Sequence, residues 1–228
     1  MKAMILAAGY GKRLRPLTQQ TPKPMLEVAG KPLLQHHIER LAASGFTDLV
    51  INTSWLGEQI ERFFGDGSQF GVQISWSREA QPLETGGGIV KALPLLGEQP
   101  FLLLNGDIWT DYPLRSISEN NIPDNGLAWL LMVANPEHNP TGDFGLVNGL
   151  VSDNVEPTFT FSGLSVIHPK LLGDYTETHE DCQSFPLRAA LWPAIERGRV
   201  GAALYNGHWY DVGTLERYRQ LNHLLAKT

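Results

Sequence analysis

Residues 5–24 read ILAAGYGKRLRPLTQQTPKP, an apolar run that leads into a glycine-broken loop. The loop carries four basic residues close together, Lys12, Arg13, Arg15 and Lys23. Its two glycines allow positive φ and remove the Cβ atoms that would keep an anion away from backbone N–H groups. Arginine offers a planar fork of donors for phosphate oxygens, and lysine adds a compact charge. The stretch therefore predicts a polyphosphate site, although a βα turn with solvated basic residues would have the same pattern.

The composition is that of an ordinary globular protein. The 228 residues carry a net charge of −6, with 42% hydrophobic and 18% charged residues, which argues against a general nucleic-acid binder. Cys182 is the only cysteine, so an internal disulfide is excluded and its expected role is that of a small buried or half-buried residue. The sequence has neither a signal-peptide pattern nor an apolar run long enough to span a bilayer. We expect a soluble cytoplasmic protein.

Strands and helices alternate over about the first hundred residues. Apolar runs predict strands at Ala3–Ala8, Leu49–Asn52, Val72–Glu79 and Phe101–Leu104, and helical spacing predicts helices at Pro32–Ser44, Leu56–Phe64 and Gly86–Leu96. This alternation is typical of a doubly wound α/β sheet with right-handed crossovers. Because ligands of such sheets bind outside the carboxyl ends of the strands, the loops after the first, third and fourth strands are expected to share a crevice.

The second half of the chain is less regular, with loops rich in Asn, Pro, Gly and Asp. The pattern predicts strands at Leu127–Ala134, Gly145–Val151, Thr158–Ile167 and Val200–Tyr205, and helices at Pro186–Arg197 and Thr214–Ala226, the last with Thr214 as N-cap. We interpret this half as a substrate-binding insertion on the same sheet.

Two aspartates are candidate metal ligands. Asp107 ends the apolar run FLLLNGD, and Asp211 lies in HWYDVGT. Mg²⁺ prefers one or two carboxylates combined with phosphate oxygens and water. An Asx turn at Asp107 and a helix-dipole contact at Asp211 are the simpler alternatives. Together the two residues predict a Mg²⁺ site between two phosphate-bearing substrates, whereas Asp111 is expected to cap the following segment.

The segment PLETGGG at 82–88 predicts a polar loop in which three glycines expose backbone groups to the edge of a pyrimidine. A flexible loop without a ligand is the alternative. His36 and His37 are adjacent on a predicted helix and point to different faces, so joint metal ligation is not expected.

Several motifs resemble the sugar-1-phosphate nucleotidyltransferase family, whose members make nucleotide sugars. The resemblance is carried by LAAGYGKRLRPLT and PKPML in the opening stretch and by GDGSQFG at 65–71, PLETGGGIVKAL at 82–93, LLLNGDI at 102–108, FSGLSV at 161–166 and WYDVGT at 209–214. It implies a three-layer Rossmann-like nucleotidyltransferase fold with a mostly parallel mixed central sheet. It also implies a single domain over 1–228, with a nucleotide-binding part at about 1–110, a sugar-binding part at about 111–228 and no C-terminal β-helix domain.

The resemblance implies a role for each residue that matches a functional position of the family. Backbone groups of Leu6, Ala8 and Gly9 would contact the nucleoside, Gly11 and Arg13 the triphosphate, and Gln81 and Gly86 the uracil. Lys23 and Asn105 would bind the sugar phosphate, Gly145 and Ser162 the sugar, and Asp107 and Asp211 the Mg²⁺. Arg13 and Lys23 would be the catalytic residues, on the leaving-group side and the nucleophile side.

Two positions depart from many relatives, which have glycine at Glu84 and glutamate at Ser162. A serine leaves room and removes a negative charge, which suits a sugar with an anionic lactyl ether. We therefore expect UTP and N-acetylmuramic acid α-1-phosphate to give UDP-N-acetylmuramic acid and pyrophosphate, a reaction of peptidoglycan recycling. The alternatives are a mannose-1-phosphate guanylyltransferase, another sugar-phosphate uridylyl- or thymidylyltransferase, and a non-catalytic nucleotide-sugar sensor. No nucleic-acid or membrane partner is expected.

Overall fold

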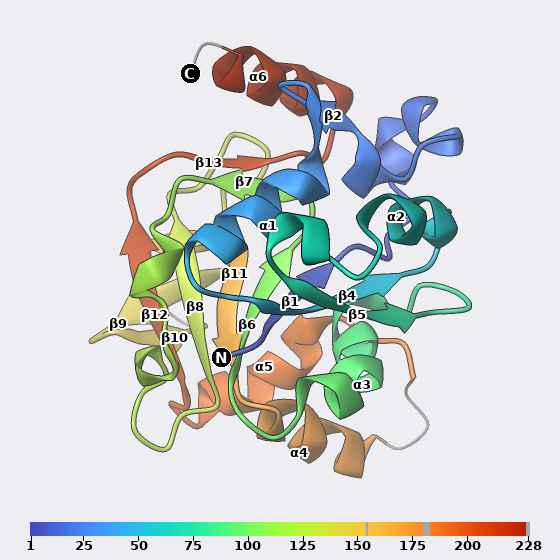
Figure 1. Ribbon diagram of the computed structural model, residues 1–228. Coiled ribbons are helices and arrows are strands. Elements are labelled where there is room, and N and C mark those ends of the chain that lie inside the picture. Colours follow the sequence, from blue (N-terminus) through green and yellow to red (C-terminus); the bar gives the residue numbers. More distant parts are fainter. Residues whose placement is uncertain (154, 180–182, 227–228) are drawn as a thin grey trace.

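A nine-stranded sheet organises the computed structural model, which describes residues 1–153, 155–179 and 183–226 (Figure 1). Cys182 lies outside the described residues. The strand order is β5-β4-β1-β6-β11-β8-β12-β10-β9. The strands are β1 Ala3–Leu6, β4 Asp48–Thr53, β5 Gln73–Arg78, β6 Phe101–Asn105, β8 Ala128–Val133, β9 Phe144–Val147, β10 Leu150–Ser152, β11 Thr158–Ile167 and β12 Val200–Tyr205. The α/β class predicted from the alternating pattern is confirmed.

The sheet is mixed in direction. Strands β5, β4, β1 and β6 pair in parallel, as the first half of the sequence predicts. β11 pairs antiparallel with both β6 and β8, and β12 runs parallel to β8. β8 and β12 therefore point the same way as the first four strands. β11, which lies between β6 and β8, points in the opposite direction.

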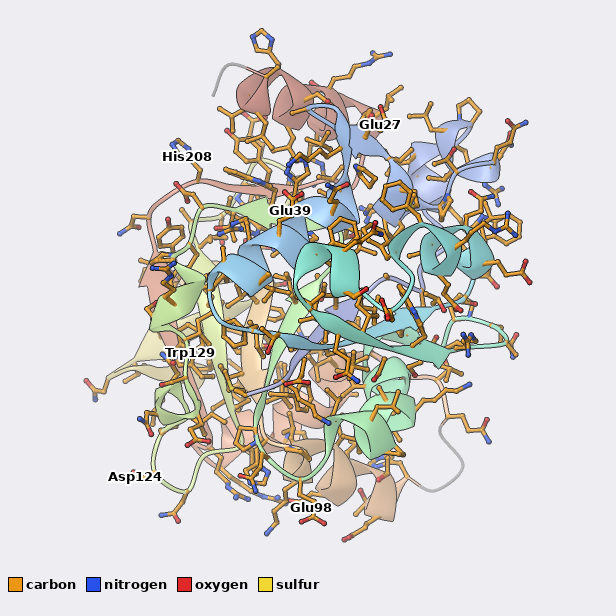
Figure 2. All side chains as sticks on the ribbon, in the orientation of Figure 1. Glu27, Glu39, Glu98, Asp124, Trp129 and His208 are labelled. Atoms are coloured by element: carbon orange, nitrogen blue, oxygen red, sulfur yellow. The ribbon has the colours of Figure 1, made fainter. Side chains whose placement is uncertain are left out.

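Helices cover both faces of the sheet (Figure 1). One face packs against α1 Leu33–Ala43 and α2 Gly57–Phe64, and the other against α3 Glu84–Leu96, α4 Lys170–Thr178 and α5 Leu187–Glu196. Along β1, Ala3 and Ile5 join the core under α1, whereas Met4 joins the core under α3. Burial on both faces explains why such strands are continuous apolar runs. Side chains fill these layers, with Trp129 buried inside and Glu98, Asp124 and His208 exposed at the periphery (Figure 2).

The single strand predicted at Gly145–Val151 is wrong, because this region is the hairpin β9–β10. Asn148 and Gly149 join its strands, and both have positive φ, 51° and 79°. Asn-Gly is a preferred sequence for such two-residue turns, so the signal was present. β9 also pairs with the start of β11, where Gly145 lies opposite Thr158, so that β11, β8, β12, β10 and β9 close into a ring of strands.

The helix predicted at Gly86–Leu96 is present as α3, but the expectation of a polar loop over all of PLETGGG is wrong in its second half. Helix α3 begins at Glu84, so Gly86, Gly87 and Gly88 lie in its first turns and are buried. A Cβ on Gly86 would meet the Phe185 ring, and one on Gly87 would meet the carbonyl oxygen of Gln183. The glycines therefore serve close packing of α3 against the segment that precedes α5. Helix α4 was not predicted, because only Leu171 and Leu172 of its nine residues are buried apolar positions.

Two small strand pairs complete the part of the chain that the structure describes. The antiparallel pair β7 Ile108–Thr110 and β13 Trp209–Asp211 places Asp211 opposite Ile108. The hairpin of β2 Glu27–Val28 and β3 Lys31–Pro32 packs beside α6 Leu215–Leu225 (Figure 1). Thr214 caps α6 as predicted, because its hydroxyl accepts from the N–H of Arg217 at 3.3 Å. None of the described helices combines the length and the apolar character needed to span a membrane.

Candidate active site

A cavity lies at the carboxyl ends of β1, β4, β5 and β6. The sequence predicts a crevice shared by the loops after β1, β5 and β6, and the structure adds the end of β4. Its lining residues are Leu6, Ala7, Ala8, Gly9, Lys23, Pro24, Asn52, Glu79, Pro82, Glu84, Thr85, Asn105, Gly106 and Asp107. At Gly9 an added Cβ would have no atom within 4 Å, so bare backbone faces open space. The predicted positions Leu6, Ala8 and Gly9 are therefore placed where a ligand can approach their backbone groups.

Lys23 of the basic loop lines this cavity, whereas Gly11 and Arg13 are not among its lining residues. Gly11 adopts a φ of 62°, and a Cβ there would lie 2.8 Å from Thr18 Cγ2. The Thr18 hydroxyl donates to the carbonyl oxygen of Gly11 at 2.8 Å, so packing alone requires a glycine here. Arg13 is exposed on a short 3-10 helix, Lys12–Leu14, near enough for its charge to act on Asp107.

The inner wall of the cavity contains a buried carboxylate that the sequence reasoning missed. Glu79 Oε1 accepts from Asn52 Nδ2 at 2.7 Å, and Glu79 Oε2 accepts from the N–H of Leu83 at 2.9 Å. The amide oxygen of Asn52 accepts from the N–H of Ala7 at 2.7 Å. These bonds tie together the ends of β1, β4 and β5 and the entry to α3. Because buried polar groups that are fully bonded fix local geometry, the wall is rigid at this point.

The two residues predicted to read uracil do not line the cavity. Gln81 is exposed, and Gly86 is buried with its N–H donating to the carbonyl oxygen of Phe185 at 2.8 Å. The Gly86 N–H is therefore engaged within the protein. Between them, Pro82, Glu84 and Thr85 contribute to the cavity wall.

Lys23 and Asp107 form an ion pair at the cavity edge. Lys23 Nζ donates to Asp107 Oδ2 at 2.7 Å. Burial raises the pKa of Asp107, but the charge and hydrogen bond of Lys23, with the charge of Arg13, outweigh it and hold that pKa below its usual value. Asp107 is therefore ionised at neutral pH.

A second cavity adjoins the first. It is lined by Asn105, Asp107, Ile108, His138, Asn139, Thr160, Phe161, Ser162, Trp209 and Asp211. Asn105 and Asp107 line both cavities, so they form the wall between two spaces. Ser162 is completely buried, and its carbonyl oxygen accepts from Trp209 Nε1 at 2.8 Å. Gly145 lies within β9 and lines neither cavity, and Asp111 instead accepts from Tyr205 and the N–H of His208.

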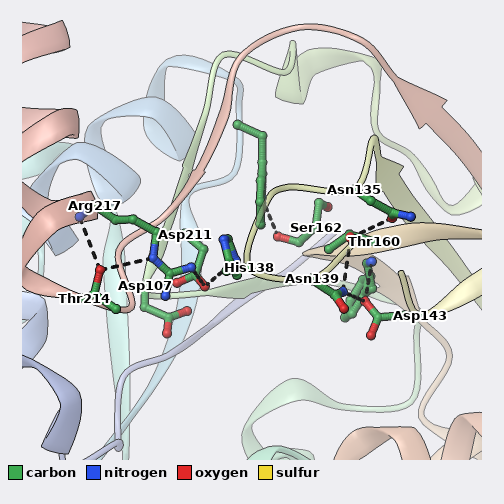
Figure 3. A network of polar contacts seen from close by, with 12 residues as sticks. Asp107, Asn135, His138, Asn139, Asp143, Thr160, Ser162, Asp211, Thr214 and Arg217 are labelled. Atoms are coloured by element: carbon green, nitrogen blue, oxygen red, sulfur yellow. Dashed lines mark hydrogen bonds and ion pairs between the residues drawn. The ribbon is translucent and has the colours of Figure 1, made fainter. Parts of the chain in front are cut away.

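Asp211 reaches this wall through the pairing of β13 with β7. The N–H of Val212 donates to the carbonyl oxygen of Asp107 at 2.7 Å, which holds the two aspartates near each other. Asp211 Oδ2 accepts from Arg217 Nη1 at 2.7 Å and lies 3.4 Å from His138 Nε2 (Figure 3). The other oxygen, Asp211 Oδ1, is buried and has no hydrogen-bond partner among the described residues.

These carboxylates suit a hard cation. Oxygen donors are what Mg²⁺ prefers, and the unbonded Oδ1 is an available ligand atom. Among the residues that the structure describes, however, no group of three or more His, Cys, Asp or Glu side chains could hold a metal ion. Asp107 and Asp211 would therefore need oxygen ligands from bound phosphates to complete a metal site.

Comparison with known proteins shows which family the chain belongs to. Residues 2–157 match the family described as nucleotidyl transferase, which is more than half of the chain. The chain belongs to the nucleotidyl transferase family. It is 46% identical over 229 residues to the N-acetylmuramate alpha-1-phosphate uridylyltransferase of Neisseria meningitidis serogroup B, and the alignment covers 96% of each chain. It is 31% identical to the mannose-1-phosphate guanyltransferase of Kluyveromyces lactis, with 93% of this chain and 61% of that relative covered.

Solved structures share the nucleotidyl transferase fold of this chain. A candidate glucose-1-phosphate thymidylyltransferase from Bacillus anthracis, crystallised with sucrose, superposes with a TM-score of 0.89 at 21% identity and covers 100% of this chain and 96% of its own. HddC from Yersinia pseudotuberculosis, complexed with GMP-PN, gives a TM-score of 0.80 at 21% identity, with 98% and 99% covered. At these identities the likeness concerns the fold.

Several residues of the candidate site were not predicted, among them Asn52, Glu79, His138 and Arg217. Asn52 and Glu79 are the last residues of predicted strands, so the reasoning that led to Asp107 would have found them. His138 and Arg217 carry no comparable signal, because only the fold brings the β8–β9 connection and α6 to Asp211.

Proposed function

We propose that this protein is an enzyme that transfers a uridylyl group from UTP to N-acetylmuramic acid α-1-phosphate, giving UDP-N-acetylmuramic acid and pyrophosphate. The observation that carries the proposal is the pair of adjoining cavities that share Asn105 and Asp107, with Lys23 at their junction. A reaction that joins two phosphates needs two binding spaces with a charged boundary. The 46% identity to the Neisseria uridylyltransferase supports this choice of nucleotide and sugar, and with it a role in peptidoglycan recycling.

We place UTP in the first cavity. Backbone groups of Leu6, Ala8 and Gly9 contact the nucleoside, while Gly11 and Arg13 lie along the triphosphate. The uracil lies near Glu79, Pro82 and Thr85, since these residues line the cavity and Gln81 and Gly86 do not.

We place the sugar 1-phosphate in the second cavity, between Asn105 and the buried Ser162. Gly145 takes part only indirectly, as a residue of the strand β9 behind that wall. The functional division is then a nucleotide part at about 1–110 and a sugar part at about 111–228 of one domain. The helix–sheet–helix layers support the description of this domain as three-layer and Rossmann-like.

In this mechanism an oxygen of the sugar phosphate attacks the α-phosphorus of UTP in line with departing pyrophosphate. Both reactants are anions, so the residues act mainly by positioning and charge compensation. Lys23 turns from Asp107 to the α-phosphate and the incoming phosphate, and Arg13 stabilises the leaving group. Asp107 and Asp211 would hold Mg²⁺, which when bound supplies charge compensation at the phosphoryl oxygens. No general base is needed, because the nucleophile is already ionised near neutral pH.

The test is pyrophosphate release with UTP, GTP and dTTP, each crossed with the 1-phosphates of N-acetylmuramic acid, N-acetylglucosamine, glucose and mannose, with and without Mg²⁺. UTP with N-acetylmuramic acid α-1-phosphate is expected to give the highest kcat/KM, and only with Mg²⁺. Faster turnover of GTP with mannose 1-phosphate would instead favour the guanyltransferase relatives. No turnover of any pair would favour a nucleotide-sugar sensor.

A further inference from the structure

Two basic side chains cover the two carboxylates of the junction. Lys23 Nζ lies 2.7 Å from Asp107 Oδ2, and Arg217 Nη1 lies 2.7 Å from Asp211 Oδ2. The Lys23 and Arg217 side chains are only 12% and 15% exposed, so water screens these charges weakly. Each of the two carboxylates is thus paired with a positive side chain without any ligand.

The position of Arg217 is built into the fold. Its Nε lies 3.4 Å from the hydroxyl of Thr214, the residue that caps α6. At Gly213 a Cβ would lie 2.9 Å from Asp211 Oδ1 and would also meet the Arg217 guanidinium. A glycine at this position is therefore required for the arginine to approach the aspartate.

This charge balance disfavours a metal ion that arrives alone. A divalent cation on Asp211 Oδ1 would lie beside the guanidinium that shares the same carboxylate. A cation on Asp107 would compete with the Lys23 ammonium for the carboxylate, and an ammonium that is only 12% exposed loses stability when its partner is taken. A metal ion bound to a triphosphate brings net negative charge, and its phosphate oxygens give Lys23 a new partner.

We propose that Arg217 and Lys23 are counter-ions that keep Asp107 and Asp211 from binding free divalent metal, so that the metal enters together with the triphosphate. The inference rests on the proposed function for the assignment of the two aspartates as metal ligands. In this scheme Arg217 is a positioning residue that acts on Asp211 and not on the substrates. Lys23 has a second role in catalysis, so Arg217 is the residue to test.

The experiment titrates the full-length protein with Mn²⁺, without nucleotide or sugar, and follows free Mn²⁺ by EPR. The wild type is expected to bind Mn²⁺ weakly. Arg217→Gln removes the charge and is expected to bind at least tenfold more tightly, whereas Arg217→Lys keeps the charge and stays within a few-fold of the wild type. Arg219→Gln, on the same helix and exposed, is the matched control and is expected to leave Mn²⁺ binding unchanged.

The double variant Arg217→Gln with Asp211→Asn tests whether Asp211 is the ligand. It should not show the tighter Mn²⁺ binding that is expected of Arg217→Gln alone. Equal Mn²⁺ binding by the wild type and Arg217→Gln would overturn the proposal. So would a gain in Arg217→Lys as large as that in Arg217→Gln, or a gain that survives Asp211→Asn. Thermal melting of each variant shows whether it is folded, and if Arg217→Gln does not fold, Arg217→Met takes its place with the same outcomes. Since the titration contains no substrate, its result is independent of which sugar and nucleotide the enzyme uses.

Discussion

His37 is a fully buried histidine behind the turn that carries Asp107. It is hydrogen-bonded to the backbone of Gly106, and its Nε2 has no partner among the described residues. Burial, reinforced by the charges of Arg40 and His36, lowers its pKa from 6.5 to about 4. The folded protein therefore holds this imidazole neutral at pH values where an unfolded chain would protonate it.

This difference predicts a loss of stability in acid. As the pH falls below 6.5, His37 is protonated in the unfolded state, whereas in the folded state it stays neutral until the pH approaches about 4. The free energy of unfolding should then fall by about 3 kcal/mol over this window, since one pKa unit corresponds to about 1.4 kcal/mol. Urea unfolding of the wild type and of His37→Gln at pH 7 and at pH 4.5 measures this fall in the free energy of unfolding. The variant lacks it, because glutamine does not titrate.

The stability difference between the wild type and His37→Gln should shift in favour of the variant at the lower pH. A difference between wild type and His37→Gln that is the same at both pH values would contradict the assigned pKa.

At the scale of elements, the entry to α3 depends on contacts with a segment from the other half of the chain. The N–H groups of Gly86 and Gly87 donate to the carbonyl oxygen of Phe185, and the N–H of Leu187 donates to the Thr85 hydroxyl at 2.6 Å. The first turn of α3 is thus held by protein acceptors that replace a ligand or solvent. The segment that leads into α5 therefore helps to hold the wall of the first cavity.

A methyl group at Gly87 should disrupt this contact. We expect Gly87→Ala to lower the free energy of unfolding by about 1–3 kcal/mol, because the added Cβ meets the backbone of Gln183, which cannot rotate away. Gly173→Ala in α4 is the matched control, since no atom lies within 4 Å of its added Cβ, and it should stabilise by about 0.5–1 kcal/mol. Equilibrium unfolding in urea measures both, and a Gly87→Ala variant as stable as the wild type would contradict the packing described here.

The elements show where sequence reasoning succeeds. Strands at Thr158–Ile167 and Val200–Tyr205 have the predicted bounds, because each run of strand-forming residues is bounded by turn-forming residues such as Pro157, Gly198 and Gly207. The helix predicted from Gly86 is present, but its glycines were also expected to expose backbone groups to a ligand, and a neighbouring segment instead fills the space that their Cβ atoms would take. That neighbour is Phe185, almost a hundred residues away, and no local pattern indicates it.

At the scale of the whole molecule, charge is unevenly distributed. The chain has a net charge of −6, yet Lys12, Arg13 and Arg15 are exposed in the loop that follows β1, and the charge of Arg13 acts on Asp107 in the wall of the first cavity. A local positive field attracts a triphosphate and is screened by salt, with a Debye length of about 10 Å at 0.1 M.

UTP binding should therefore weaken as salt increases. Between about 20 and about 200 mM NaCl, at constant Mg²⁺, we expect the Kd for UTP measured by calorimetry to rise roughly fivefold or more. Uridine has the same base and ribose without the charge, so its Kd should change little. Similar salt effects on both ligands would show that the basic loop does not act on the phosphates.

The sequence predicts those residues of the candidate site that lie at the ends of strands or in the glycine loop. Asp107, Lys23 and Gly9 satisfy this condition, and the fold places all three in the first cavity. His138 and Arg217 do not, because only the tertiary fold brings the β8–β9 connection and α6 beside Asp211. Tertiary contacts of this kind leave no periodic signal in the sequence.

The ring of strands has a further consequence for behaviour in solution. An end strand of an open sheet presents unpaired N–H and C=O groups that invite a strand from another molecule. Here β9 pairs with both β10 and β11, so this end of the sheet offers little template for aggregation. The opposite end is β5, whose Arg78 is held by Glu61 at 2.6 Å. Intermolecular strand addition, where it occurs, should therefore start at β5.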